Sequence, residues 1–250
     1  MKPGFFSALY QCSATLAYLL GRKRKFMNLG YLGETGIEIK NEDRKDAHHI
    51  ALYSLLIGMN DNNAKTALEM GCGRGGGAYV MSKYFNIQDL TGVDLSSANI
   101  RLASGLVPGV QFISADAVQF KSDKKFDLIV NLESSHRYSS RKAFFKNVSE
   151  MMSDNSSFVF GDMIRKNEEP EVEKMMEESG LKIVKKITVN DGIVRSIETN
   201  SRKQYPIATR FPFFFPRRMH SFYVTIHSRA YKKLKTGETS YSLYLLKRGQ

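Results

Sequence analysis

A glycine-rich stretch, residues 66–77, constrains the fold of this chain more than any other part. Its sequence is TALEMGCGRGGG, in which an apolar run typical of a buried strand passes into glycines and then into the start of a helix. Glycine adopts positive φ without strain and lets a ligand approach bare main chain. An acid, Glu69, stands two residues before the first glycine, Gly71. The stretch therefore predicts a strand–turn–helix unit with a ligand site at the turn.

A second acid stands where the next strand is expected to end. The apolar run 90–94 ends in Asp94 and is followed by Leu95. In open α/β sheets, a carboxylate at the tip of the second strand binds the hydroxyls of a ribose. Together with the glycine turn, Asp94 predicts a cofactor that contains a nucleoside.

The glycines fit the patterns of two cofactor classes. Gly71, Gly73 and Gly76 satisfy the dinucleotide pattern G-x-G-x-x-G. Gly71, Gly73 and Gly75, with Glu69, equally satisfy E-x-G-x-G-x-G. This second pattern resembles motif I of the class I S-adenosylmethionine (SAM) methyltransferases, in which an acid helps to organise acceptors for the ammonium group of SAM.

Three further segments resemble the same family. Residues 114–117, SADA, resemble its adenine-binding segment, and residues 126–132, FDLIVNL, resemble its fourth motif, which faces the methyl donor. Residues 26–31, FMNLGY, resemble a segment whose tyrosine lies against the cofactor. The ordered set favours SAM over a dinucleotide. The cofactor-binding residues that it implies are Tyr31, Glu69, Gly71, Gly73, Gly75, Asp94, Leu95, Asp116, Ala117 and Asn131.

Strand-like and helix-like patterns alternate through the core, which predicts a parallel, doubly wound sheet with right-handed crossovers. Strands are expected at 66–70, 89–94, 110–114, 126–131 and 156–161, with helices at 42–59, 76–84, 96–106 and 141–152. Then come a helix at 168–179, a strand at 181–189, a helix at 191–201 and a closing strand at 240–247. We expect strands four and five to be separated by a central strand. The resemblance implies an antiparallel closing strand and an α/β, Rossmann-like, seven-stranded class I methyltransferase fold with a helical N-terminal cap.

The domain organisation expected is a short cap before one large domain. Residues 1–41 are interpreted as a cap helix and cofactor-covering segment, and residues 42–250 as the SAM-binding domain, with an insertion at about 191–225. The apolar run 5–20 is short for a membrane span, so it predicts an amphipathic helix over the active site or, alternatively, on a membrane surface. Residues 205–219 predict an apolar loop at the acceptor. The acceptor-binding residues expected are Phe5, Leu9, His136, Tyr138, Phe211, Phe214 and Met219.

The charge is concentrated at the two ends of the chain. The net charge is +12, to which residues 1–27 contribute +5 and residues 195–250 contribute +10. Such ends suit an anionic membrane surface, nucleic acid or an acidic substrate. We do not expect nucleic acid, because no separate RNA-binding domain is evident and no proline-aromatic motif follows strand four. The two cysteines, Cys12 and Cys72, favour the reducing cytoplasm, with membrane association as an alternative, and the spacing of histidines and cysteines predicts no metal site.

The chemistry is expected just after strand four, in residues 131–138, NLESSHRY. This run resembles bacterial O-methyltransferases of lipids, polyketides and other natural products, and phthiotriol-type enzymes carry a similar Glu-Ser-Ser-His run. A histidine titrates near neutrality and can accept the proton of an alcohol or phenol, so we expect His136 to be the general base. Asp162 is the expected orienter and Glu133 the reserve candidate. The expected reaction is transfer of a methyl group to a hydroxyl oxygen of a hydrophobic small molecule; a carboxylate or amine acceptor, and less so RNA or DNA, stay open as alternatives.

Overall fold

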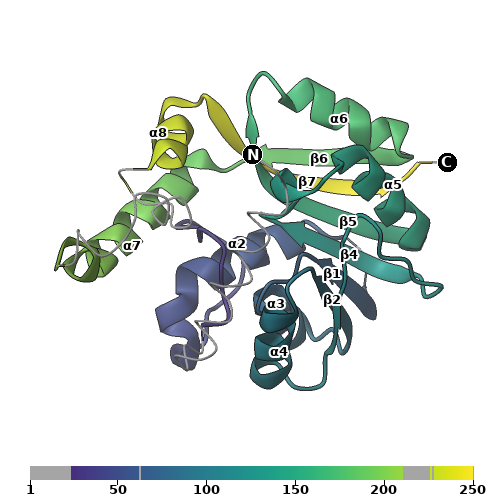
Figure 1. Ribbon diagram of the computed structural model, residues 1–250, viewed down its shortest axis with the longest axis horizontal. Helices are drawn as coiled ribbons and strands as arrows, with labels where there is room; N and C mark the ends of the chain where they lie inside the picture. The colour runs from purple at the N-terminus through teal and green to yellow at the C-terminus, as the bar shows by residue number, and fades with distance from the viewer. Residues whose placement is uncertain (1–23, 62, 211–225, 227, 250) are drawn as a thin grey trace.

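Seven strands form one twisted sheet within the residues that the computed structural model describes, 24–61, 63–210, 226 and 228–249 (Figure 1). The spatial order is β3-β2-β1-β4-β5-β7-β6, in which β7 runs antiparallel to both of its neighbours. The expected seven-stranded α/β fold with an antiparallel closing strand is thus confirmed. The strands are β1 (Thr66–Met70), β2 (Asp89–Asp94), β3 (Gln111–Ser114), β4 (Phe126–Leu132), β5 (Met152–Arg165), β6 (Leu181–Thr188) and β7 (Thr239–Arg248).

Helices cover both faces of the sheet. They are η1 (Asn41–Asp46), α2 (Ala47–Ile57), α3 (Gly76–Phe85), α4 (Ser97–Leu106), η2 (Ser135–Arg137), α5 (Arg141–Met151), α6 (Glu169–Glu178), α7 (Asn190–Arg210) and α8 (Arg229–Thr236). Side chains of α2, α3, α7 and α8 form one core with the sheet, and side chains of α5 and α6 form the other. The alternation of β4 explains the division, because Leu128 and Val130 enter the first core while Ile129 enters the second.

Hydroxyl side chains fix where several helices begin. Ser96, expected to be a helix cap, accepts a hydrogen bond from the main-chain nitrogen of Asn99 at 3.3 Å. Ser140 and Ser228 cap α5 and α8 in the same way, at 3.1 Å each. Each cap satisfies a main-chain donor that the first turn of a helix leaves unpaired.

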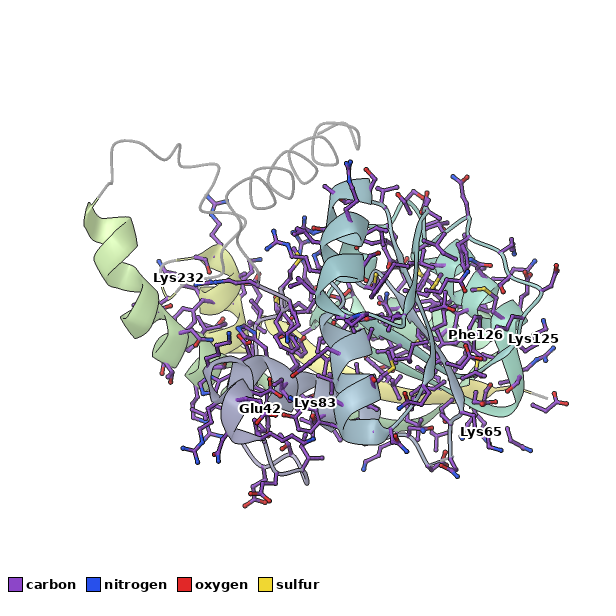
Figure 2. The ribbon with its side chains drawn as sticks, turned by 90° about the horizontal axis from the view of Figure 1, so that it is seen from below. Glu42, Lys65, Lys83, Lys125, Phe126 and Lys232 are labelled. Carbon is purple, nitrogen blue, oxygen red and sulfur yellow. The ribbon has the colours of Figure 1, made fainter. Side chains whose placement is uncertain are left out.

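The amino-terminal helices are joined to the Rossmann core by a polar cluster. Figure 2 shows Glu42 of η1 and Lys83 of α3 side by side, and Lys83 Nζ lies 3.0 Å from Glu42 Oε1 and 2.8 Å from Asp43 Oδ2. The buried carboxylate of Asp43 also accepts from the hydroxyls of Tyr79 and Tyr84, each at 2.7 Å. These contacts join η1, which leads directly into α2, to Tyr79, Lys83 and Tyr84 of α3.

The structure differs from the expected elements in several places. First, β4 and β5 pair directly, with Leu132 opposite Gly161, so the expectation that a central strand separates them is wrong. Second, the helix expected from residue 42 begins as the separate helix η1, and third, β5 is longer than expected. Fourth, α7 continues to Arg210 through Pro206, where a loop was expected from residue 205; a proline removes one helical hydrogen bond but does not by itself end a helix. The short helices η2 and α8 were not expected.

None of the helices in the described residues is both long and apolar enough to cross a bilayer. In Figure 1, α7 and α8 lie side by side at one end of the molecule, away from α5 and α6. The expected cap helix at 5–20 and the aromatic part of the expected loop, 211–219, lie outside the described residues. The division into a cap of residues 1–41 and a domain of residues 42–250 stays a prediction.

Candidate active site

The glycine turn after β1 presents main chain at the edge where the parallel strands end. Gly71, Gly73 and Gly75 have φ values of +76°, +53° and +80°, which other residues adopt only with strain. The main-chain nitrogens of Gly71 and Cys72 both donate to the carbonyl of Val93, at 2.7 and 2.9 Å. The turn is therefore fixed to the end of β2.

Asp94 completes this connection with its side chain. Its Oδ2 accepts from the nitrogen of Gly73 and its Oδ1 from the nitrogen of Ser96, each at 2.9 Å. Burial raises the pKa of Asp94 above its ordinary value, against these hydrogen bonds. The next residue, Leu95, is 52% exposed and presents an apolar side chain beside the end of β2.

Glu69 is buried beneath the glycine turn and is not exposed at its surface. Its side chain is 1% exposed and accepts from the hydroxyl of Tyr53 at 2.8 Å and from the nitrogen of Ala78 at 2.9 Å. Burial raises the pKa of Glu69 to about 7, despite these two donors. A Cβ at Gly77 would lie 2.2 Å from Glu69 Oε1, so the last glycine of the stretch gives the carboxylate its room. Glu69 thus fixes the turn and the start of α3.

Of the segment 26–31, Met27 rather than Tyr31 lies at the turn. A Cβ at Gly73 would lie 3.2 Å from the sulfur of Met27, whose side chain is 46% exposed. The ring of Tyr31 packs instead on Gly192 of α7, where a Cβ would approach it to 2.0 Å. The expected contact of Tyr31 with the cofactor is thus not supported by its packing, and Met27, which the motif did not single out, occupies that side of the turn.

The end of β3 brings the expected adenine segment to the same edge. The nitrogen of Ala115 donates to the carbonyl of Asp94 at 3.0 Å. Asp116 is half-buried and its Oδ1 accepts from the nitrogen of Val118 at 2.9 Å, which fixes the loop. Ala117 is buried, and its carbonyl accepts from Asn147. Asp116 is thus the member of this pair with an accessible polar group.

A polar cluster at the end of β4 and in the loop that follows packs against Gly71, the first glycine of the turn. Asn131 Nδ2 donates to the carbonyl of Met70 and to the hydroxyls of Ser134 and Tyr138, at 2.7, 2.7 and 3.0 Å. A Cβ at Gly71 would lie 2.4 Å from Ser134 Oγ and 2.8 Å from the Tyr138 hydroxyl. Asn131 Oδ1 is buried and has no hydrogen-bond partner among the described residues.

The loop that follows places His136 on Asp162, the residue just beyond Gly161 in β5. His136 Nδ1 lies 2.8 Å from Asp162 Oδ1, while the main-chain nitrogen of His136 and the hydroxyl of Ser135 both donate to Oδ2, at 3.0 and 2.6 Å. Arg141 in turn donates to Ser135 Oγ at 3.3 Å. Asp162 is fully buried, whereas the side chain of His136 is 29% exposed. The structure therefore brings together the two residues expected to act as base and orienter.

The electrostatics of this pair favour an ion pair. Burial alone lowers the pKa of His136, but the Asp162 carboxylate outweighs it and raises that pKa above the ordinary value. Burial alone raises the pKa of Asp162, but His136 and Ser135 outweigh it and lower it. When the imidazole is neutral, Nδ1 donates to Asp162 and Nε2 is left as an acceptor, to which Arg137 Nε donates at 3.3 Å.

Glu133, the reserve orienter, makes its hydrogen bonds elsewhere. Its carboxylate accepts from the nitrogen of Leu29 and from the hydroxyl of Tyr241, and none of its recorded hydrogen bonds is to His136. Burial raises the pKa of Glu133 to about 7, against these two donors. Glu133 acts on His136 only through its charge, which helps to raise the histidine pKa.

The expected acceptor-binding residues Phe5, Leu9, Phe211, Phe214 and Met219 lie outside the described residues. Tyr138 is described and lies against Gly71, as stated above. No group of three or more His, Cys, Asp or Glu side chains is arranged to hold a metal within the described ranges.

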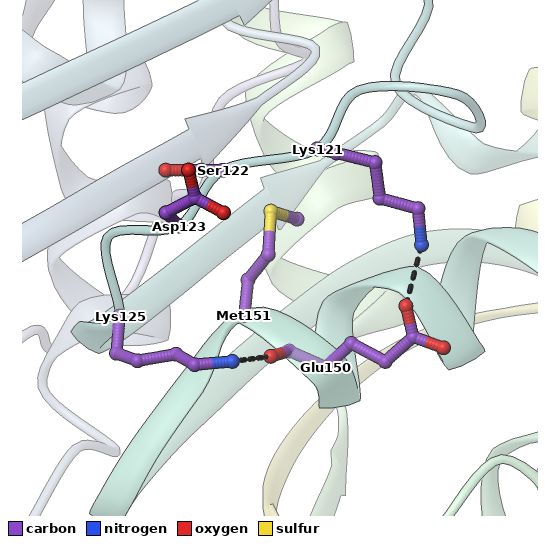
Figure 3. A pocket seen from close by; sticks show the side chains of 6 residues that line it. All are labelled: Lys121, Ser122, Asp123, Lys125, Glu150 and Met151. Atoms are coloured by element: carbon purple, nitrogen blue, oxygen red, sulfur yellow. Dashed lines mark hydrogen bonds and ion pairs between the residues drawn. The ribbon is translucent and has the colours of Figure 1, made fainter.

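A cavity of about 320 Å³ lies at the opposite edge of the sheet, before β4 begins (Figure 3). The two lysines that line it, Lys121 and Lys125, both interact with Glu150. Lys121 forms an ion pair with the carboxylate of Glu150, and Lys125 donates to the main-chain carbonyl of the same residue. The cavity is therefore distinct from the candidate active site, and both of its lysines are already engaged.

Comparison with known proteins agrees with this arrangement. Residues 67–155 match the family model described as a methyltransferase domain. The chain is 29% identical over 224 residues to the fatty-acid O-methyltransferase of Mycolicibacterium smegmatis, which covers 88% of this chain and 81% of the relative. It is 28% identical over 225 residues to the phthiotriol/phenolphthiotriol dimycocerosates methyltransferase of Mycobacterium tuberculosis, covering 88% and 83%.

Solved structures of low sequence identity share the fold. One is the O-methyltransferase of a trans-AT polyketide synthase from Brevibacillus brevis, in complex with S-adenosyl-L-homocysteine; its TM-score is 0.68 at 17% identity, covering 90% of this chain and 85% of that one. Another is the cyclopropane synthase MmaA2 of Mycobacterium tuberculosis, with a TM-score of 0.68 at 12% identity, covering 90% and 92%. The sheet order and these similarities lead to one conclusion: the chain has the Rossmann-like class I fold and carries a SAM-dependent methyltransferase domain.

Proposed function

We propose that this enzyme transfers the methyl group of SAM to a hydroxyl oxygen of a hydrophobic small molecule or lipid, with His136 as general base. The observation that carries the proposal is the 2.8 Å contact between His136 Nδ1 and Asp162 Oδ1. His136 lies on the loop whose Ser134 and Tyr138 lie against the glycine turn at Gly71, and Asp162 lies in β5. A base at this place is adjacent to where the methyl donor binds.

The residues proposed to hold SAM are the turn Gly71–Gly75, Asp94 at the ribose, Leu95 and the Asp116 loop at the adenine, and Asn131 at the amino group. When bound, SAM supplies a methyl group on a sulfonium, which is already a good leaving group. The protein then has to hold the acceptor oxygen in line with the methyl–sulfur bond and remove its proton.

Proton removal is proposed to occur at Nε2 of His136. Asp162 holds Nδ1–H, so the lone pair of the neutral imidazole is on Nε2. Arg137 Nε donates to that lone pair at 3.3 Å, and an acceptor hydroxyl takes the place of this donor when it binds. The proton moves to Nε2, and the buried Asp162 carboxylate stabilises the imidazolium that forms.

A carboxylate acceptor is the second candidate, and two observations favour it. The Mycolicibacterium smegmatis relative is named a fatty-acid O-methyltransferase. Asp162 also raises the pKa of His136, which increases the cationic share of the imidazole at neutral pH and so favours binding of an anion. A carboxylate is already ionised at pH 7, and in that reaction His136 positions the acceptor and removes no proton.

The hydrophobic character of the acceptor is proposed on three grounds. The relatives are named for fatty-acid and phthiotriol lipids. The sequence has an apolar stretch at 5–20 and an aromatic one at 211–215. These stretches are proposed to roof the acceptor pocket. A role in natural-product biosynthesis, a cytoplasmic location and peripheral membrane contact through the basic N-terminus belong to the same proposal.

The experiment is the His136→Ala variant assayed from pH 6 to 9 with a long-chain alcohol or phenol and with a fatty acid. With the hydroxyl acceptor, kcat at pH 7 should fall by about 10²–10⁴-fold, because a general base is lost. With the fatty acid, KM should rise while kcat changes little. Affinity for S-adenosylhomocysteine serves as the control and should be nearly unchanged. A variant that methylates the hydroxyl acceptor at full rate across this pH range rules out the base.

A further inference from the structure

Residues 26–32, called here the cover segment, pack between the glycine turn and the helices α2 and α7. The nitrogens of Tyr31 and Leu32 donate to the carbonyls of His48 in α2 and Gly192 in α7, at 2.8 and 3.0 Å. Ser196 of α7 donates to the carbonyl of Leu29 at 3.0 Å. The cover segment is therefore held by its main chain along one side.

Two positions show how closely the cover segment fits. Gly30 has φ +74°, and a Cβ there would lie 2.7 Å from Ser196 Oγ and 2.9 Å from the Cβ of His48. Asn28 is buried and its Oδ1 accepts from the nitrogen of Gly30 and contacts His49 Nδ1, each at 2.9 Å. The chain thus follows a path that few other sequences allow.

Another main-chain donor of the segment, the nitrogen of Leu29, is held by the active-site loop. It lies 3.0 Å from Oε1 and 3.2 Å from Oε2 of Glu133. The hydroxyl of Tyr241 in β7 donates to the same Oε1 at 2.6 Å. Glu133 has φ +53°, a left-handed backbone that a glutamate adopts only when its surroundings hold it there.

The other end of the segment reaches the glycine turn. Met27, two residues from Leu29, lies beside Gly73, and the ring of Phe26 lies 2.7 Å from where a Cβ of Gly76 would be. Releasing Leu29 frees the chain immediately behind these two side chains. The buried carboxylate of Glu133 is thus connected to Met27 at the glycine turn. The connection is the hydrogen bond from the nitrogen of Leu29 and the two residues of chain between Leu29 and Met27.

We propose that Glu133 is a positioning residue for the cofactor and takes no part in proton transfer: its carboxylate holds the cover segment against the glycine turn, so that bound SAM is retained. The assignment rests on the contacts of Glu133 with Leu29 and Tyr241 and is independent of the role proposed for His136. Burying a carboxylate is unfavourable unless its oxygens are hydrogen-bonded, and these two donors supply that compensation.

Two substitutions separate positioning from chemistry. Glu133→Ala removes both acceptor oxygens and leaves Leu29 and Tyr241 with unpaired donors. Glu133→Gln keeps an oxygen at the place of Oε1, to which both donors are directed. A glutamine maintains the hydrogen bonds without charge, whereas an acid–base or charge-orienting role is lost in both variants.

The test measures affinity for S-adenosylhomocysteine by calorimetry and amide hydrogen exchange of the peptide that contains residues 26–32. Glu133→Ala should weaken affinity by about 10–100-fold and speed exchange in that peptide at least tenfold. Glu133→Gln should stay within about fivefold of the wild type in both. With saturating SAM, kcat of Glu133→Ala should change much less than KM for SAM.

Glu173→Ala is a matched control, because Glu173 accepts from another tyrosine of β7, Tyr244, at 3.0 Å on the opposite face of the sheet. It should leave affinity and exchange unchanged. If Glu133→Ala does not fold, Tyr241→Phe removes one donor from the same carboxylate and should still speed exchange of the cover segment severalfold. The proposal is overturned if Glu133→Gln is as impaired as Glu133→Ala, or if kcat falls while affinity and exchange stay at wild-type values.

Discussion

The two halves of the active site are built from different parts of the chain. The cofactor half, around the glycine turn, consists largely of main-chain groups from residues 69–97. The half proposed for the acceptor consists largely of side chains, and the contacts of Asp162 with His136 and Ser135 join residues 26 and 27 positions apart. The first half is therefore sensitive to any added Cβ, and the second to the loss of individual functional groups.

The proposed cofactor site has one buried glutamate on each of its two sides. Glu69 accepts from the hydroxyl of Tyr53 and a main-chain nitrogen, and Glu133 accepts from the hydroxyl of Tyr241 and a main-chain nitrogen. Burial raises the pKa of both carboxyls to about 7. The first fixes the turn beneath the cofactor and the second holds the segment above it, so one kind of interaction stabilises both sides of the same ligand site.

The largest effect should come from Gly71→Ala, at the contact between the halves. The new Cβ would lie 2.4 Å from Ser134 Oγ, and the residue would have to keep φ at +76°. Strain and overpacking together should reduce affinity for S-adenosylhomocysteine, and stability with it, by about 2–5 kcal/mol. Calorimetry and thermal melting provide the measurement.

Gly109→Ala is the control for Gly71→Ala, because Gly109 also has positive φ, +86°, but has open space where a Cβ would be. It should lose stability through backbone strain alone and retain cofactor affinity. Equal affinity losses in the two variants would mean that the contact with Ser134 and Tyr138 is unimportant.

A smaller effect is expected from Asp94→Ala, which tests the side chain that joins the glycine turn to the end of β2. The variant loses the hydrogen bonds to the nitrogens of Gly73 and Ser96 as well as the proposed ribose contact. Affinity for SAM should fall by about 1.5–3 kcal/mol, measured by calorimetry. Unchanged affinity, or tight binding of NAD by the wild-type protein, would contradict the placement of the ribose.

The smallest effect should be the pH shift caused by Asp162→Asn in the acceptor half. The Asp162 carboxylate raises the pKa of His136, so its removal should lower that pKa. A base acts when it is deprotonated, so the rise of kcat/KM with pH should be centred above the ordinary histidine pKa of about 6.5 in the wild type and at lower pH in the variant. The maximal rate should also fall, though less than in His136→Ala, because an amide does not enforce the same imidazole tautomer. If the pH profile of Asp162→Asn is the same as that of the wild type, Asp162 does not influence the group whose titration controls the rate.

The sequence predicted the structure best where an element depends on residues that are close to one another along the chain. The strand–turn–helix unit of residues 66–77, the Ser96 cap and the doubly wound order follow from local patterns, and the structure confirms these elements. His136 and Asp162 were expected to converge because both follow strands of one sheet, and they do, although the expected strand between β4 and β5 is absent from the described sheet.

What sequence did not predict depends on contacts between distant segments. Nothing local marks Leu29 as the partner of Glu133, or Met27 rather than Tyr31 as the neighbour of the turn. Helix α8 has a weak signal, a serine cap followed by Tyr231 and Leu234 at helical spacing, which its many lysines obscured. The length of α7 was underestimated because residues 205–219, which include Pro206, were interpreted as a loop.

The antiparallel direction of β7 has a consequence for the order in which the enzyme is completed. The beginning of this strand lies where the parallel strands end, and so Tyr241 reaches Glu133 from the last strand to be synthesised. In the described sheet, β6 pairs only with β7, so it has no partner until β7 has emerged. A nascent chain can form the glycine turn early, but it acquires a closed active site only when its final strand inserts between two strands already made.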